Sequence, residues 1–322
     1  MDISNSRIVA LGGGTGLSTM LRGLKKYTEH LTAIVTVADD GGGSGMIRED
    51  LNLLPPGDIR NCLLALAEAE PLMQKLFQYR FDAGRLKGQS FGNLFLAAMC
   101  GISDNFEQAV QRASEVLAVT GRVLPVTECD VNLCARLENG TQVMGESLIP
   151  ELSRRYARKI KSVFLCPGDA KPLPDCLKAI EEADLIILGP GSLYTSIIPN
   201  LLVEGIADAI RTAKAPVVYV SNIMTQCGES DGMSAFDHMQ AISQHTGGNV
   251  VDYCIANCEE VPEEYIKRYQ EELAEPVLPD AERFAEVGVK LITEQLLDTS
   301  GGTVRHDYVR LAEVIAALVE SL

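Results

Sequence analysis

The chain has 322 residues, of which 46% are hydrophobic and 22% charged, so it can bury a sizeable core and is not globally disordered. Its 28 basic and 44 acidic residues give a formal net charge of −16 at pH 7, which disfavours nucleic acid and anionic membrane surfaces as partners. The nine cysteines contain no C-x-x-C pair and only four histidines occur, a composition that argues against a structural zinc site.

Short apolar runs alternate with segments of helical periodicity in both outer thirds of the chain. This order is typical of βαβ units and predicts an α/β fold, a Rossmann-like doubly wound and mostly parallel sheet. The predicted strands are residues 7–11, 32–37, 162–166, 185–188, 216–221 and 250–256. The predicted helices are residues 17–27, 173–182, 200–212, 234–245 and 262–273, with a closing helix at 307–322.

The middle of the chain has a different pattern. Residues 58–69, 72–81, 93–100 and 106–119 show helical periodicity in succession, without a strand between them, and predict a helical cap over about 55–120. Asn139-Gly140 then joins two alternating runs, 131–138 and 142–148, and predicts a β-hairpin within about 122–148. Because no linker or low-complexity tract interrupts the chain, we expect residues 1–322 to form a single unit.

The first glycine-rich motif, Gly12-Gly13-Gly14-Thr15-Gly16, lies between a predicted strand and a predicted helix. Glycines there let main-chain N–H groups and the positive end of the helix approach a phosphate. Leu17 occupies the third glycine position of the dinucleotide fingerprint, so the spacing is G-x-G-x-G. A tight turn without a ligand is the alternative interpretation.

A second motif, Asp39-Asp40-Gly41-Gly42-Gly43-Ser44-Gly45, follows the next predicted strand. Parallel strands end at the same edge of a sheet, so the two motifs are expected to meet in one crevice. We interpret Asp39, Asp40, Gly41, Gly42 and Ser44 as ligand contacts. The two carboxylates are expected to hold a ribose hydroxyl or a Mg²⁺ ion that bridges a diphosphate, and a solvated turn is the alternative.

Two further polar loops follow later strands. The segment Gly189-Pro190-Gly191-Ser192-Leu193-Tyr194-Thr195-Ser196 combines glycines with hydroxyls, and Asn222 to Gly232 is polar and punctuated by glycine. An ordinary Ser or Thr helix cap would explain only one of these hydroxyls. The predicted contacts here are Gly189, Gly191, Ser192, Thr195, Asn222 and Thr225.

Five isolated residues complete the set of candidates. Asp58 and Arg60 open a helix after Pro55-Pro56-Gly57, and Asn93 precedes a strongly apolar helix, although Asp58 and Asn93 also suit plain N-caps. Arg305 suits bidentate phosphate recognition and Tyr265 suits stacking on a base or sugar, while an exposed Arg and a partly buried Tyr are the alternatives. We assign no catalytic residue.

In this order and spacing, residues 12–17, 39–45, 55–61, 189–196 and 222–232 resemble the YvcK-type gluconeogenesis factor family, within the superfamily of 2-phospho-L-lactate transferase. The resemblance implies a Rossmann-like fold that binds a nucleotide sugar such as UDP-N-acetylglucosamine. It also implies a regulatory role in growth and cell shape on gluconeogenic carbon sources. Tyr265 and Arg305 would match its sugar-nucleotide contacts. Met46 stands where an Arg is usual, which weakens the case for phosphoryl transfer.

Two alternatives stay open for function. The protein is either a nucleotide-sugar sensor or a transferase of phosphorus-containing groups, and NAD and GDP are alternative nucleotides to a UDP-sugar. An NAD-dependent oxidoreductase is disfavoured by the missing fingerprint glycine. The chain begins without a secretory signal and lacks an apolar run of about 20 residues, so we expect a cytoplasmic protein without membrane insertion. We also expect a homo-oligomer and a cavity lining that is locally positive.

Overall fold

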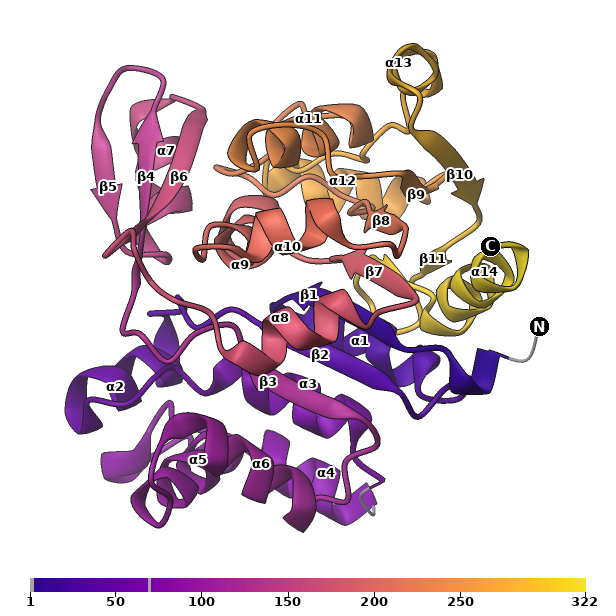
Figure 1. Cartoon of the computed structure of the whole chain (residues 1–322). Helices are drawn as coiled ribbons and strands as arrows, with labels where there is room; N and C mark the ends of the chain where they lie inside the picture. Colours follow the sequence, from indigo (N-terminus) through magenta and orange to yellow (C-terminus); the bar gives the residue numbers. More distant parts are fainter. Residues whose placement is uncertain (1–2, 69–70) are drawn as a thin grey trace.

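The computed structural model describes residues 3–68 and 71–322, and within them the central feature is a seven-stranded sheet (Figure 1). The strand order is β10-β9-β8-β7-β1-β2-β3, and every neighbouring pair is parallel. The strands are β1 (Ile8–Gly12), β2 (Leu31–Val35), β3 (Arg122–Pro125), β7 (Leu185–Leu188), β8 (Val217–Val220), β9 (Tyr253–Asn257) and β10 (Lys290–Glu294). The predicted Rossmann-like, mostly parallel sheet is confirmed.

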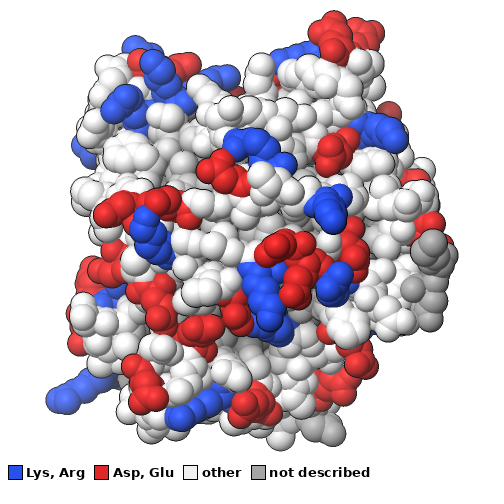
Figure 2. Space-filling view, viewed as in Figure 1, with Lys and Arg blue, Asp and Glu red and all other residues white. Residues whose placement is uncertain are grey.

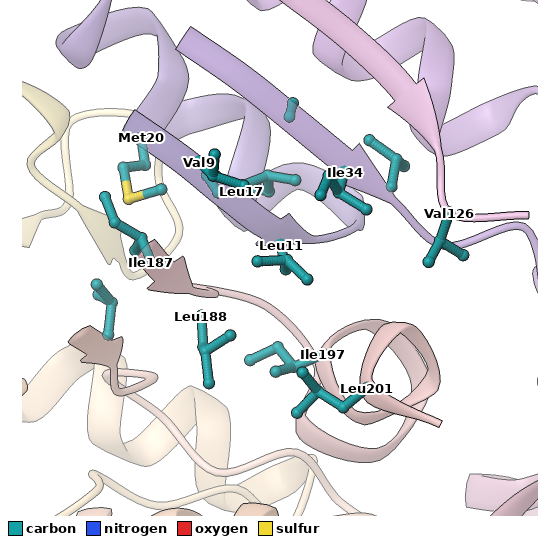
Figure 3. Packing of buried hydrophobic residues seen from close by; sticks show 14 of the residues in the cluster. Val9, Leu11, Leu17, Met20, Ile34, Val126, Ile187, Leu188, Ile197 and Leu201 are labelled. Atoms are coloured by element: carbon teal, nitrogen blue, oxygen red, sulfur yellow. The ribbon is translucent and has the colours of Figure 1, made fainter. Parts of the chain in front are cut away.

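Two groups of helices flank this sheet. α1 (Gly14–Leu24) contacts both α3 (Gly57–Leu66) and α14 (Tyr308–Ser321), and a separate group contains α8 (Pro174–Glu181), α9 (Ile198–Leu201), α10 (Ile206–Thr212) and α11 (Ala235–His245). The central strands β1 and β7 are buried along their whole length, as expected for a parallel sheet covered on both faces. Figure 3 shows Leu11, Leu17, Ile34 and Leu188 packed in this core.

The predicted helical insertion lies between β2 and β3. It contains α2 (Gly42–Leu51), α3, α4 (Pro71–Gln78), α5 (Phe91–Gly101) and α6 (Phe106–Val116), and the described residues between β2 and β3 include no strand. The end predicted for the first of these helices, at Ala69, lies outside the described residues. Helix α2 was not predicted, because its first residues are the glycines that we interpreted as a loop.

The predicted hairpin is confirmed, but its surroundings differ from the prediction. β4 (Asn132–Leu137) pairs with β5 (Gln142–Met144) and with β6 (Ile160–Cys166) in a separate antiparallel sheet, and α7 (Leu148–Tyr156) connects β5 to β6. The assignment of residues 162–166 to the parallel sheet is therefore wrong. β6 alternates between buried and exposed side chains, as expected for an antiparallel strand covered on one face. Residues 122–125 belong to the main sheet as β3, outside the hairpin.

The C-terminal half contains elements that the sequence pattern did not reveal. The helix predicted over 200–212 is interrupted by Gly205, which has a φ of 86° and separates α9 from α10, and a π-helical turn η3 (Leu193–Ile197) precedes α9. After α12 (Glu263–Glu271) come α13 (Ala281–Val287), β10, and a short antiparallel pair of β11 (Leu297–Asp298) and β12 (Arg305–His306).

In the part of the chain that the structure describes, no single helix has both the length and the apolar composition to cross a bilayer. Among the described residues, one pair of helical segments, 193–201 and 206–212, passes that test when the two are taken together, and the two segments are bent by 75° relative to each other.

Candidate ligand-binding site

A cavity of about 930 Å³ opens beyond the carboxyl ends of β1, β7 and β8. The chain continues from β1 to β2 on one side and from β7 to β8 on the other, so this is the point where the strand order reverses. Open parallel sheets bind their ligands at such a point. The loops after β1, β7 and β8 contribute Gly13, Gly14, Thr15, Gly16, Pro190, Gly191, Ser192, Asn222, Thr225 and Gln226 to the lining.

The loop of residues 12–16 and the loop of residues 189–196, called here the first and third loops, touch at glycines, which have no side chain to separate them. A Cβ added at Gly16 would lie 2.7 Å from the carbonyl oxygen of Pro190, and one added at Gly191 would lie 3.2 Å from that of Gly13. Helix α1 begins at Gly14, so its first main-chain N–H groups lie at the cavity wall. The fold therefore brings two sets of main-chain donors together.

The second motif lies behind the first. Residues 39–45 are not among the described residues that line the cavity, and Asp58 stands between them and the first loop. A Cβ at Gly13 would lie 2.5 Å from Asp58 Oδ2, and one at Gly57 would lie 3.0 Å from Asp39 Oδ2. Asp58 does not cap α3; its carboxyl instead accepts a hydrogen bond from the Gly14 amide.

The Asp40 carboxylate binds main-chain amides at the start of α7. Its Oδ2 accepts a hydrogen bond from the Glu146 amide (3.0 Å) and its Oδ1 accepts one from the Ser147 amide (2.9 Å), at the start of α7. Asp39 Oδ1 accepts the Gly41 amide (2.9 Å). Within the described residues no group of three or more His, Cys, Asp or Glu side chains is arranged to hold a metal ion. Both carboxylates of the pair thus have main-chain donors, and Mg²⁺ binding stays a prediction.

Three other candidates make contacts away from the cavity. The Arg60 guanidinium donates to Ser90 Oγ and to Asn93 Oδ1 (2.8 Å), and Ser90, rather than Asn93, caps α5. The Tyr265 hydroxyl donates to the carbonyl oxygen of Thr299 (3.0 Å). These contacts anchor the helical insertion and the C-terminal segment.

Arg305 does line the cavity, together with residues that the sequence analysis missed. Arg154 comes from α7, Arg268 and Tyr269 come from α12, and His306 follows Arg305 in β12. The Tyr269 hydroxyl accepts the Val304 amide (3.1 Å), so α12 and the segment before β12 are held together. Tyr265 and Tyr269 are one helical turn apart, and that spacing could have directed attention to Tyr269.

The charged side chains of the lining nearly cancel. Among the described lining residues, three arginines and three glutamates line the cavity: Arg154, Arg268, Arg305, Glu229, Glu271 and Glu272. The expected positive lining is therefore not produced by side chains, and main-chain N–H groups must supply the remaining attraction for an anion. Figure 2 shows acidic side chains and Lys or Arg side chains interspersed on one outer face, most of which is formed by other residues.

Three carboxyl groups predict how the stability of the ligand-free protein depends on pH. Burial raises the pKa of Asp58 from 3.8 to about 7, that of Glu229 from 4.5 to about 7 and that of Glu146 from 4.5 to about 8. A raised folded-state pKa favours the protonated form, so this contribution is complete below pH 3.8 and is lost as the pH rises towards 8. We expect the melting temperature to fall between pH 6.5 and 8.5, and to fall less in Glu229→Gln.

Differential scanning calorimetry across this range measures the effect. Burial lowers the pKa values of His238 and His306 from 6.5 to about 4. These two groups therefore change the stability of the protein mainly between pH 4 and 6.5, below the range measured. A melting temperature that is constant or rises towards pH 8.5, or an equal slope in the variant, would contradict this prediction.

The fold and the cavity together define a doubly wound parallel α/β protein with a polar, glycine-lined cavity at its switch point. Residues 8–297 match the family model described as 2-phospho-L-lactate transferase CofD, and the chain belongs to this family. It is 58% identical over 318 residues to a putative gluconeogenesis factor of Thermoanaerobacterium thermosulfurigenes, which covers 99% of this chain and 98% of the relative.

Other relatives agree with this assignment. The gluconeogenesis factor of Bacillus subtilis is 48% identical over 315 residues, with 98% of each chain covered. A crystal structure of a UPF0052 family protein from Bacillus halodurans superimposes with a TM-score of 0.92 at 47% identity, covering 96% of this chain and 98% of that one. The resemblance stated from the sequence is confirmed.

Proposed function

We propose that this protein is a nucleotide-sugar-binding regulatory factor, with UDP-N-acetylglucosamine as the type of ligand, needed for growth and cell shape on gluconeogenic carbon sources. Its close relatives are named gluconeogenesis factors, which supports a role in growth on such substrates. The cytoplasmic location, the homo-oligomeric state and the organisation of the chain as a single unit remain predictions from the sequence.

The contact between the first and third loops carries the proposal. Glycines at positions 16 and 191 allow the two loops to touch, which places main-chain N–H groups of both on one cavity wall. Arg154, Arg268 and Arg305 add cationic groups at the same cavity. Such a combination is suited to bind a diphosphate. Amide donors and a helix N-terminus bind the phosphate oxygens, and guanidinium groups neutralise their charge.

Isothermal titration calorimetry tests this function. We expect UDP-N-acetylglucosamine to bind more tightly than NAD or GDP, and N-acetylglucosamine alone, which lacks the diphosphate, to show no binding. Failure of UDP-N-acetylglucosamine to bind at millimolar concentration would remove the proposal.

The family match supports a second candidate, a transferase of phosphorus-containing groups. Incubation of the wild-type protein with UDP-N-acetylglucosamine, with and without Mg²⁺, followed by chromatography, separates the two. A sensor returns the ligand intact, whereas a transferase releases a new nucleotide product. Asp40→Asn is a poor discriminator, because Asp40 holds the start of α7 and its loss changes the structure in either case.

A further inference from the structure

One wall of the cavity is chemically unlike the rest. The first and third loops present main-chain N–H donors, whereas the loop after β8 contributes the side chains of Gln226 and Glu229. Both side chains have a buried oxygen, Gln226 Oε1 and Glu229 Oε2, without a hydrogen-bond partner in the described part of the chain. Two residues of the cavity lining therefore each hold a buried acceptor without a donor.

Gln226 is held in place by one side-chain and one main-chain hydrogen bond. Its Nε2 donates to Ser192 Oγ (2.7 Å), and its main-chain N–H donates to Ser230 Oγ (3.0 Å). The contact with Ser192 joins the loop after β8 to the loop after β7. With Nε2 engaged on Ser192, the unpartnered Oε1 marks a position where a donor is needed.

Glu229 gives the stronger observation, because above its pKa of about 7 both oxygens of the carboxylate accept hydrogen bonds. The residue is only 8% exposed, and its Oε1 accepts the Thr195 hydroxyl (3.4 Å). The Tyr194 amide also donates to this carboxyl. A buried acceptor left without a donor is destabilising, so Oε2 favours a ligand that brings one.

We infer that Gln226 and Glu229 form an acceptor subsite in which Gln226 Oε1 and Glu229 Oε2 receive hydrogen bonds from hydroxyl groups of the ligand's sugar. A carboxylate repels phosphate oxygens, so the diphosphate lies towards the glycine loops and the sugar lies towards the loop after β8. This inference rests on the proposed function, because it divides the same cavity between the two parts of a nucleotide sugar.

The test compares Glu229→Gln with the wild type at pH 8, using UDP-N-acetylglucosamine, UDP and inorganic pyrophosphate in calorimetric titrations. The Tyr194 amide still requires an acceptor, so the new amide nitrogen takes the place of Oε2. That nitrogen cannot accept a hydrogen bond, so a neutral contact with the hydroxyl replaces a charge-assisted one. We expect the affinity for UDP-N-acetylglucosamine to fall about tenfold or more, and that for pyrophosphate to stay the same or rise. A parallel loss for UDP assigns the subsite to the ribose, and unchanged UDP binding assigns it to the hexose.

Glu286→Gln, which makes the same chemical change at an exposed position on α13, is the control and should bind all three probes like the wild type. If Glu229→Gln does not fold by calorimetry, Gln226→Met tests the other acceptor, and the affinity for UDP-N-acetylglucosamine should fall in the same way. An unchanged affinity for the nucleotide sugar, or an equal loss for pyrophosphate, overturns the subsite alone. A wild-type protein that binds neither nucleotide overturns the proposed function and, with it, the subsite.

Discussion

Replacing Gly16 with alanine is expected to lower the affinity for a nucleotide diphosphate by about 100-fold or more. The added Cβ would lie 2.7 Å from the Pro190 carbonyl oxygen and 2.9 Å from its carbon, and neither backbone atom can move without shifting the third loop. Each hydrogen bond to a charged group contributes about 1.5–3 kcal/mol, so losing the alignment of one donor on each loop removes about 3 kcal/mol. At about 1.4 kcal/mol per tenfold change, that loss corresponds to about 100-fold.

Calorimetric titration with UDP-N-acetylglucosamine measures this effect, and Gly101→Ala is the matched control. Gly101 ends helix α5, has no strained backbone, and a Cβ there meets nothing within 4 Å. The control should bind like the wild type. A Gly16→Ala protein that remains folded and binds with unchanged affinity would show that the contact between the two loops is irrelevant to the ligand.

Replacing Arg305 with alanine is expected to weaken binding of both the nucleotide sugar and pyrophosphate about 10- to 100-fold. Arg305 and His306 form strand β12. His306 is buried, and its Nε2 lies 3.1 Å from the Ser221 carbonyl oxygen. That anchor fixes the strand beside the loop after β8, so the exposed guanidinium lies at the cavity. Removal of one charge-assisted contact of about 1.5–3 kcal/mol gives the expected loss.

Two further variants sharpen this prediction. Arg305→Lys keeps the charge but not the bidentate geometry, so it should restore only part of the affinity. Arg310→Ala removes a guanidinium that pairs with Glu294 and Glu313 on the outside of α14, and it should leave binding unchanged. Equal affinities of Arg305→Ala and Arg310→Ala would exclude Arg305 from the phosphate contacts.

The sheet and its first and third loops could be predicted from the sequence because their signals are local. Apolar runs such as residues 185–188 mark buried parallel strands, and the glycines beside them mark loops that approach one another closely. The Asn139-Gly140 turn likewise predicted the hairpin. In each case the residues that determine the structure are adjacent in the chain.

The remaining features depend on contacts between distant residues. The position of Asp40 after a strand predicts a ligand contact. In the structure its carboxylate instead accepts hydrogen bonds from the amides of residues 146 and 147, more than 100 positions away. Arg154 belongs to α7, a helix that the periodicity did not reveal, and only the fold brings it to the cavity. Glu229 has no sequence motif; its importance follows from burial and from an unpartnered oxygen.

A crystal structure of the protein with UDP-N-acetylglucosamine tests the central claim most directly. Our account predicts diphosphate oxygens about 2.7–3.2 Å from main-chain nitrogens of both residues 15–16 and residues 191–192, because the Gly14 amide already donates to Asp58. Diphosphate density outside the cavity beyond β1 and β7, or phosphate oxygens held only by side chains, would contradict it.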